Sequence, residues 1–312
     1  MPNLNVAVLG SLGYSKEYGK KGTDSDVTLY NMKKGSTTVT FIEPSKYPEK
    51  LASLFYSASF GDFAILVVDR INAALGESIL MLDSVGVEKG LIIPRNYISS
   101  EQVKKLTSGT VANDYHLMED DPPQLRNYLI EVAEKHPMLS DSSVGSVIID
   151  HYFNVRGVGA VALGVVRGGQ IHVHDKLKAL PLEATAQVRS IQKHDEDYET
   201  AESGDRVGLA LKNIEVDSME RGMVLTNDES YVVSDTLQGH LKQVKYWIRP
   251  LLEGMPLHVG IGMQFVSGNM KSLNGDSVTI NLDKNIVYRQ GDRATITYLN
   301  GGNLRIIGNI KL

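Results

Sequence analysis

The residues best suited to chemistry stand near the start of the chain, in the segment NVAVLGSLGYSKE of residues 5–17. An apolar run expected to form a strand passes into a glycine turn, and a lysine follows six positions after the first glycine. This order is typical of a phosphate-binding loop, G-x-x-x-x-G-K-[ST], in which main-chain N–H groups and the lysine hold the phosphates of a nucleotide. Gly10 and Lys16 occupy the first-glycine and lysine positions and are the candidate cofactor-binding residues.

Two other positions of this loop depart from the pattern. Ser15 replaces the second glycine, and Glu17 replaces the serine or threonine whose neutral oxygen binds magnesium. A carboxylate can bind magnesium, but Glu17 would lie beside the most anionic part of a nucleotide and repel it. The sequence therefore predicts a relic loop that does not bind a triphosphate in the ordinary way. The plainer alternative is that Gly10 is a turn glycine and Lys16 a solvated lysine.

The same segment offers a second kind of chemistry. Lys16, Lys20 and Lys21 form a small basic cluster, with Tyr14 and Tyr18 interleaved. Lysines contact RNA phosphates without reading the base sequence, and aromatic rings stack on unpaired bases. We therefore predict these three lysines as nucleic-acid-binding residues, with solvated surface charge as the alternative.

Strands alternate with helices over residues 1–140, which predicts an α/β fold with a mainly parallel sheet. The apolar runs FAILVVD and GLIIP are typical of strands buried on both faces. Asp121 before two prolines resembles the N-cap of a helix. The expected strands are 6–9, 27–30, 38–42, 63–69, 90–94 and 115–118, and the expected helices are 49–59, 73–85, one beginning at Ser99 and Ser100, and one from Asp121 through Lys135.

The pattern changes after His136-Pro137 and the polar run 139–143, which mark a boundary. Short alternating runs separated by Gly, Asp and Asn continue to the end of the sequence, as is typical of β-barrels or sandwiches. A further break falls near residues 226–230. The expected domains are an α/β domain at 1–140 and two all-β barrels at 141–228 and 229–312.

Composition limits the class of protein. The chain has 312 residues, enough for two or three domains, with 42% hydrophobic and 22% charged residues and a formal net charge of −5. It has no cysteine, which excludes disulfides, cysteine–zinc sites and thiol catalysis and favours a cytoplasmic location. No run is long and apolar enough to span a membrane, and residues 1–5 lack the basic region of a signal peptide. Residues 229–312 carry nine basic and six acidic side chains. This positive excess is explained either by chance or by a mildly basic surface that binds nucleic acid.

Two stretches of the second third carry a resemblance to a known family. They are SVIIDHYFNVRGVGAVALGVVRGGQIHVHDKL (146–177) and ATAQVRSIQKHDEDYETAESGDRVGLALKNIEVDSMERGMVL (184–225). Through RGVGAVALGVVRGG, VRSIQKH, AESGDRVGLAL and ERGMVL they resemble domain 2 of translational GTPases of the elongation factor Tu type. Residues 229–312 are similar to domain 3 of that family through WIRPLLEGMPLHVGIG, ATITYLN and LRIIGNIKL. The overall pattern resembles archaeal relatives and the selenocysteine-specific factor more than bacterial elongation factor Tu.

The resemblance implies an N-terminal P-loop GTPase-like domain, whose motifs can be compared one by one. In FIEPSKYPEKL, Glu43 takes the position of the aspartate of the switch II motif D-x-P-G-H, Lys46 that of the glycine and Tyr47 that of the water-orienting histidine. Tyr47 cannot act as a base at neutral pH, because the ordinary pKa of tyrosine is about 10. The guanine-reading motif N-K-x-D is replaced by the run PRNY (94–97), which offers no aspartate to the base.

The length of the segment after the loop is a further departure. Only about ten residues separate Lys16 from Val27, which leaves space for two helical turns at most. The first helix and the switch I loop of the family must therefore be short or absent here. A phosphate would then lose the helix N-terminus that normally faces it.

Two histidine-bearing segments are the remaining candidates. His172 and His174 are expected on one face of a strand, a spacing that can hold a metal, but no third ligand is evident and we predict no metal site. In elongation factor Tu the segment that matches VRSIQKH helps to hold the aminoacylated tRNA end. The resemblance therefore makes Gln192 and His194 candidate nucleic-acid-binding residues, whereas Asp195 would repel RNA. We find no Ser-His-Asp arrangement and predict no catalytic residue.

The resemblance and the departures together predict an elongation factor-like protein that binds tRNA or the ribosome, in the cytoplasm, without a working GTP switch. Two alternatives stay open. One is a divergent active GTPase, which Gly10 and Lys16 support, and the other is a scaffold whose barrels hold a protein partner. No cofactor is predicted for the first hypothesis, and GTP and magnesium belong to the GTPase alternative.

Overall fold

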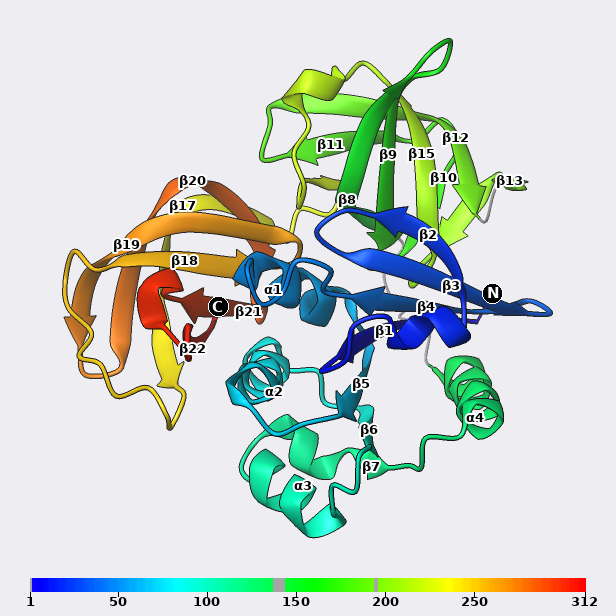
Figure 1. Cartoon of the computed structure of the whole chain (residues 1–312). Coiled ribbons are helices and arrows are strands. Elements are labelled where there is room, and N and C mark those ends of the chain that lie inside the picture. Colours follow the sequence, from blue (N-terminus) through cyan, green and yellow to red (C-terminus); the bar gives the residue numbers. More distant parts are fainter. Residues whose placement is uncertain (1, 137–143, 194–195) are drawn as a thin grey trace.

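The computed structural model describes residues 2–136, 144–193 and 196–312. Along the chain they form a mostly parallel sheet with helices, followed by two β-barrels that lie on two sides of it (Figure 1). The predicted order of an α/β part and then two all-β parts is therefore confirmed. None of the helices within the described ranges is long and apolar enough to cross a membrane.

The first sheet has seven strands in the order β2-β3-β4-β1-β5-β6-β7. Along the order β4-β1-β5-β6-β7 each strand is parallel to the next, whereas the pairs β2–β3 and β3–β4 at one edge are antiparallel. β3 and β4, at the expected strands 27–30 and 38–42, form an antiparallel hairpin. The bounds are Asn3–Leu9 (β1), Lys20–Asp24 (β2), Thr28–Lys34 (β3), Thr37–Glu43 (β4), Phe63–Val68 (β5), Gly90–Pro94 (β6) and His116–Leu117 (β7).

Helices cover both faces of this sheet because successive residues of its buried strands point to opposite faces. In β5, Leu66 belongs to the core that contains α1 and α2, whereas Ile65 belongs to the core that contains α4. Side-chain caps begin three helices, from Asn72, Ser99 and Asp121. The helices are Leu51–Phe60 (α1), Ala73–Val85 (α2), Ser100–Thr107 (α3) and Pro122–Lys135 (α4), with short 3₁₀ helices at Tyr14–Glu17, Val111–Asp114, Val216–Ser218 and Leu299–Gly301.

The second part is a six-stranded barrel with its own core. Its ring runs β11-β16-β8-β9-β15-β12 and closes through the pairing of β11 with β12, while β13 pairs with the outer edge of β12 and β10 pairs with β14. The bounds are Ser146–Val155 (β8), Gly159–Val166 (β9), Gln170–His172 (β10), Lys176–Leu180 (β11), Ala184–Lys193 (β12), Glu196–Tyr198 (β13), Thr200–Glu202 (β14), Arg206–Lys212 (β15) and Val224–Thr226 (β16).

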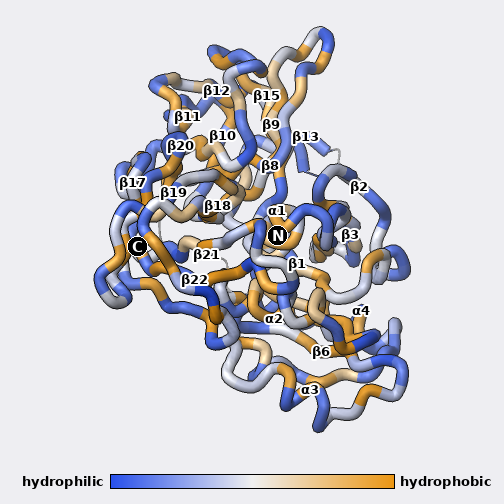
Figure 2. Tube along the Cα trace, turned by 60° about the vertical axis from the view of Figure 1, so that its left-hand side comes forward, coloured by the Kyte–Doolittle hydropathy of each residue, from blue (hydrophilic) through white to orange (hydrophobic). Residues whose placement is uncertain are grey.

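The third part is a closed barrel in the order β17-β20-β19-β18-β21-β22. Its interior forms one continuous hydrophobic cluster with α1 and α2 of the first part, and Figure 2 shows hydrophobic stretches near β22 and α2. The first part and this barrel therefore share a core. The bounds are Tyr231–Gln243 (β17), Pro256–Ile261 (β18), Gln264–Asn274 (β19), Ser277–Arg289 (β20), Arg293–Thr297 (β21) and Ile306–Lys311 (β22).

Candidate functional site

The glycine turn after β1 is required by close packing. Gly10 has φ +94°, and a Cβ at this position would lie 2.1 Å from the carbonyl oxygen of Val67 in β5. Both features exclude ordinary side chains. Gly10 therefore holds the chain against the neighbouring strand, whatever else the loop does.

The main-chain amides of this loop are bonded to a carboxylate of the same chain. Glu43, the last residue of β4, accepts a hydrogen bond from the N–H of Gly13 to Oε2 and another from the N–H of Ser15 to Oε1, each 2.6 Å long. Glu43 is buried, with 3% of its surface exposed. An anion thus sits where the loop presents its N–H donors, and that anion is a side chain. We call the pair of amides together with the Glu43 carboxylate the glutamate-filled loop.

The lysine of the loop is not drawn into this contact. Lys16 is exposed, and its side chain folds beside Gly13, where a Cβ would lie 3.4 Å from Nζ. Ser15 is fully buried, and its Oγ has no hydrogen-bond partner among the described residues. The two predicted cofactor-binding residues, Gly10 and Lys16, thus lie at opposite ends of a loop whose donors already have an acceptor.

The segment after the loop is short, as predicted from its length. Tyr14–Glu17 is a single turn of 3₁₀ helix, and the edge strand Lys20–Asp24 follows it. No α-helix lies between Lys16 and Val27, a stretch that is described in full. The prediction that the first helix is short or absent is confirmed.

Tyr47 packs at the interface between the first part and the third part, which is a barrel. Its hydroxyl donates to the carbonyl oxygen of Ala74 (2.8 Å) and to Oε2 of Glu77 (3.1 Å). Burial, and then the neighbouring Glu77 carboxylate, raise the pKa of Tyr47 well above its ordinary value. Arg305 of the third barrel donates to the same carboxylate from Nε (3.1 Å) and Nη2 (2.6 Å). The residue at the water-orienting position therefore belongs to a buried interface.

A basic cavity of about 520 Å³ lies between β2, β3 and the second barrel. It is lined by two of the predicted lysines, Lys20 and Lys21, and by the predicted Gln192, although these residues are far apart in the sequence. Lys33 and Arg206 add two more cationic groups. We call this hollow the basic cavity.

Polar partners hold parts of the basic cavity in place. Lys21 pairs with Asp24 (2.7 Å), and the Gln192 amide donates to Asp197 (2.9 Å). Lys16 is not among the lining residues, and His194 lies outside the described residues. The basic cavity therefore unites three of the five predicted nucleic-acid-binding residues.

The predicted stacking role of the tyrosines is wrong for Tyr18. Its ring is buried, with 4% of its surface exposed, and packs against Phe41. Its hydroxyl donates to the hydroxyl of Tyr14, which in turn donates to Asp120 (2.8 Å). A ring in the core cannot stack on a base, so Tyr18 supports the loop from below.

The expected shared face of His172 and His174 is also wrong. β10 ends at His172, and His174 follows with φ +75°. The left-handed backbone breaks the strand alternation on which the prediction rested. Within the described ranges, no group of three His, Cys, Asp or Glu side chains is arranged to hold a metal ion.

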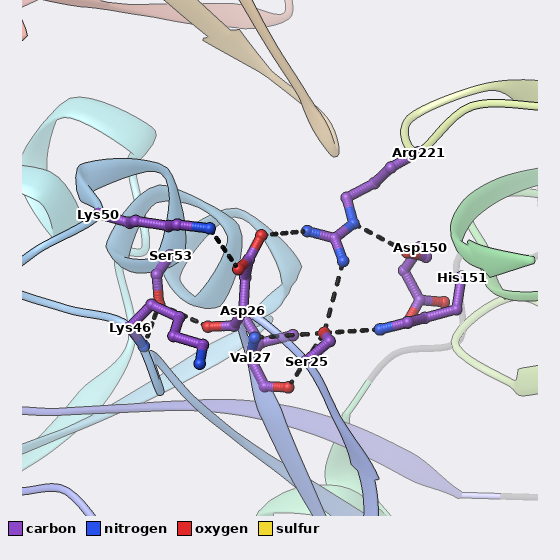
Figure 3. A network of polar contacts seen from close by, with 9 residues as sticks. All are labelled: Ser25, Asp26, Val27, Lys46, Lys50, Ser53, Asp150, His151 and Arg221. Carbon is purple, nitrogen blue, oxygen red and sulfur yellow. Dashed lines mark hydrogen bonds and ion pairs between the residues drawn. The ribbon is translucent and has the colours of Figure 1, made fainter.

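A Ser-His-Asp arrangement is present, contrary to the sequence-based expectation (Figure 3). His151 Nε2 lies 2.7 Å from Ser25 Oγ, and His151 Nδ1 lies 2.6 Å from Asp150 Oδ2. Ser25 comes from the β2–β3 turn, and the other two residues come from β8. The histidine and serine are 126 positions apart, so only the packing of the second barrel against the sheet reveals the contact.

Comparisons with known proteins agree with this architecture. Residues 159–226 match the family described as elongation factor Tu domain 2. The chain is 36% identical to the uncharacterized protein MJ0325 of Methanocaldococcus jannaschii, over 100% of both chains. It is 26% identical to the selenocysteine-specific elongation factor of the same organism, over 83% of this chain and 59% of that protein. The chain thus spans about three fifths of the length of that factor.

Solved structures show the same fold. The elongation factor SelB of Methanococcus maripaludis, in complex with the GTP analogue GppNHp, superposes with a TM-score of 0.82 at 22% identity, covering 100% of this chain and 79% of that one. A bacterial selenocysteine-specific elongation factor gives a TM-score of 0.83 at 18% identity, covering 100% and 58%. At these identities the likeness establishes the shared fold.

Proposed function

Because the chain belongs to the translational GTPase family, of the kind that includes SelB and elongation factor Tu, we propose that it binds tRNA or the ribosome without a functional GTP switch. In this proposal its three domains are 1–140, 141–228 and 229–312, and it acts in the cytoplasm. In this proposal the protein uses neither GTP nor magnesium.

The observation that carries the proposal is the glutamate-filled loop. A nucleotide phosphate could reach the N–H groups of Gly13 and Ser15 only by displacing Glu43, which accepts from both at 2.6 Å. Each hydrogen bond to a charged group contributes about 1.5–3 kcal/mol. A phosphate that approached without displacing Glu43 would face a carboxylate at a few ångströms, with a repulsion of about 4 kcal/mol per pair of unit charges at 4 Å. Both routes disfavour binding of a triphosphate.

The contacts of the third barrel support a fixed domain arrangement. Arg305 and Glu77 form an ion pair whose side chains are 14% and 3% exposed. The interiors of the first part and the third barrel are one cluster. A switch that turned these parts against each other would have to expose that shared core, which is unfavourable in proportion to the apolar area exposed.

The basic cavity supports the binding of RNA. Three exposed lysines line it, Lys20, Lys21 and Lys33, beside Arg206, whose guanidinium is paired with the Asp150 carboxylate. Clustered lysines and arginines attract the phosphate backbone, and the exposed amide of Gln192 offers both a donor and an acceptor to a base or a ribose. The basic cavity lies between the sheet and the second barrel, where it would accommodate a single-stranded RNA end.

Two titrations test the proposal. A fluorescent GTP analogue with magnesium, competed with GDP and ATP, should show no saturable binding at micromolar concentration. Binding of tRNA should be saturable and should weaken steeply with salt, because phosphate contacts release counterions. Guanine-specific binding at micromolar concentration would instead support the divergent GTPase. Absence of both affinities would favour a protein-binding scaffold.

A further inference from the structure

The contact between the β2–β3 turn and β8 brings together a serine, a histidine and an aspartate, the three side chains that form an activated nucleophile in many enzymes. Ser25 Oγ, the ring of His151 and the carboxylate of Asp150 form a continuous chain with contacts of 2.7 and 2.6 Å (Figure 3). A serine, a base in hydrogen-bond reach of it, and a third group that orients the base define this catalytic arrangement. None of the three belongs to the glutamate-filled loop or lines the basic cavity.

The local strand geometry explains how two consecutive residues reach the same contact. The β8–β9 pairing shifts register between Ile149 and His151, which marks a β-bulge. A bulge interrupts the alternation of side chains and re-aims one of them. Asp150 therefore lies beside the ring of His151, and the side chain of His151 is 15% exposed, within reach of solvent.

Electrostatics sets the roles of the three groups. Burial would raise the pKa of Asp150, but the charge of Arg206 and the hydrogen bonds from His151 and Arg206 outweigh it and lower the pKa. Arg206 donates to both carboxylate oxygens, at 3.0 and 2.9 Å. An ionised carboxylate only accepts, so the proton of the neutral ring lies on Nδ1, and Nε2 is left to accept from the Ser25 hydroxyl.

Two N–H donors lie beside the serine oxygen. Arg221 Nη2 and the N–H of Val27 are each 3.4 Å from Ser25 Oγ. Arg221 is itself held by Asp26 (3.3 Å) and by the carbonyl oxygen of Asp150, to which its Nε donates (2.9 Å). Donors in this position stabilise negative charge on the serine oxygen while its proton is being removed.

We propose that Ser25 is the nucleophile of a carboxylic-ester hydrolase site, with His151 as its general base and Asp150 as the group that orients the base. The serine oxygen bonds to the carbonyl carbon while its proton moves to His151 Nε2. The tetrahedral intermediate then breaks the bond to the leaving alcohol, which takes that proton. Water, deprotonated by His151, attacks the acyl-serine, and the acid and the free serine are released. Two kinds of ester share this chemistry, an aminoacyl ester at an RNA 3′ end and a small free ester. The first of them rests on the proposed function.

A fluorophosphonate probe tests the activated serine without any assumption about the substrate. The full chain should be labelled on Ser25, as located by peptide mass spectrometry, and Ser25→Ala should abolish the label. His151→Gln retains a group that can hydrogen-bond to the serine but not a base, and should slow labelling at least 100-fold, as expected for loss of a general base. Ser45 is partly exposed and its hydroxyl contacts that of Thr28, so Ser45→Ala is the matched control and should be labelled like the wild type.

The outcomes separate the proposal from a structural contact between domains. Absence of label on Ser25, or equal labelling of the wild type and His151→Gln, overturns it. Ser25→Ala removes one oxygen only and keeps the test valid should the histidine variant fold poorly. Release of amino acid from aminoacyl-tRNA, or of p-nitrophenol from p-nitrophenyl esters, identifies the ester class. If neither substrate is hydrolysed, the proposal is overturned. Affinity for tRNA, measured on Ser25→Ala, reports on the proposed function independently.

Discussion

Replacing Glu43 by alanine should both weaken the fold and open the phosphate loop. The carboxylate accepts two short hydrogen bonds from Gly13 and Ser15. In the variant these donors lose their acceptor, and that of Ser15 lies at a buried residue. The substitution therefore converts a loop filled by a side chain into one that can accept an anion from solution.

The size of the effect follows from the contacts. At about 1.5 kcal/mol for each hydrogen bond to a charged group, the lower end of the usual range, the loss is about 3 kcal/mol. For a cooperative unit of about 200 residues this lowers Tm by about 6–12 °C. If the emptied loop binds sulfate with a dissociation constant of about 5 mM, 50 mM sulfate restores about 1.4 kcal/mol, or about 3–6 °C.

Differential scanning calorimetry in chloride and in sulfate at matched ionic strength measures both effects. The control is Glu17→Ala, which removes an exposed carboxylate from the same loop and should change stability by no more than about 0.5 kcal/mol. Sulfate should stabilise Glu43→Ala by several degrees more than it stabilises the wild type or the control. Equal sulfate responses in all three proteins, or a Glu43→Ala variant as stable as the wild type, would refute the reasoning.

Three other predictions concern charged side chains outside this loop. Replacing Lys20 and Lys21 by alanine should weaken tRNA binding and lower the slope of log K against log salt by about one unit per lysine, as measured by a salt series. Arg305→Met leaves a buried carboxylate on α2 without its cation and should lower the free energy of unfolding by about 3–5 kcal/mol in urea. The lowered pKa of Asp150 means that its contribution to stability is complete above the ordinary aspartate pKa of about 4 and is lost as the pH falls through the folded-state value. The stability difference between the wild type and Arg206→Met should therefore narrow in acid, as followed by thermal melts from pH 7 to pH 3.

Matched controls make these outcomes decisive. Lys104 and Lys105 are exposed on α3, away from the basic cavity, and their double alanine variant should retain the salt slope of the wild type. Arg126→Met, at a surface contact with a backbone carbonyl, should change stability far less than the Arg305 variant. An unchanged salt slope for the first pair, a fully stable Arg305→Met, or a stability difference for Arg206→Met that widens in acid would each contradict the corresponding prediction.

The architecture was largely predictable because local signals agreed with tertiary packing. The helix Ala73–Val85 was predicted at both ends, since Asn72 caps its start and Gly86, with φ +87°, ends it. The buried strands of the first sheet are uninterrupted apolar runs that few other structures accommodate. β2 was missed because Lys20–Asp24 is a polar edge strand, which lacks the alternation that marks a half-buried one.

The candidate sites were only partly predictable. Sequence reasoning identified Glu43 as a replacement in a motif, but the partner of its carboxylate lies 30 positions earlier and depends on the pairing of β4 with β1. It identified Lys20 and Gln192 separately, and only the packing of the second barrel against the sheet places them on one cavity. The contact between Ser25 and His151 likewise joins the first sheet to the second barrel. Such contacts are set by tertiary docking, for which a local pattern carries no signal.

The affinity for tRNA in the presence of GTP and of GDP, each with magnesium, is the most direct test of a translation factor without a nucleotide switch. Linkage requires that any nucleotide that controls RNA binding change the RNA dissociation constant. With the loop filled by Glu43, the dissociation constants should be the same with GTP, with GDP and with neither. A tenfold or larger tightening by GTP relative to GDP would contradict the account.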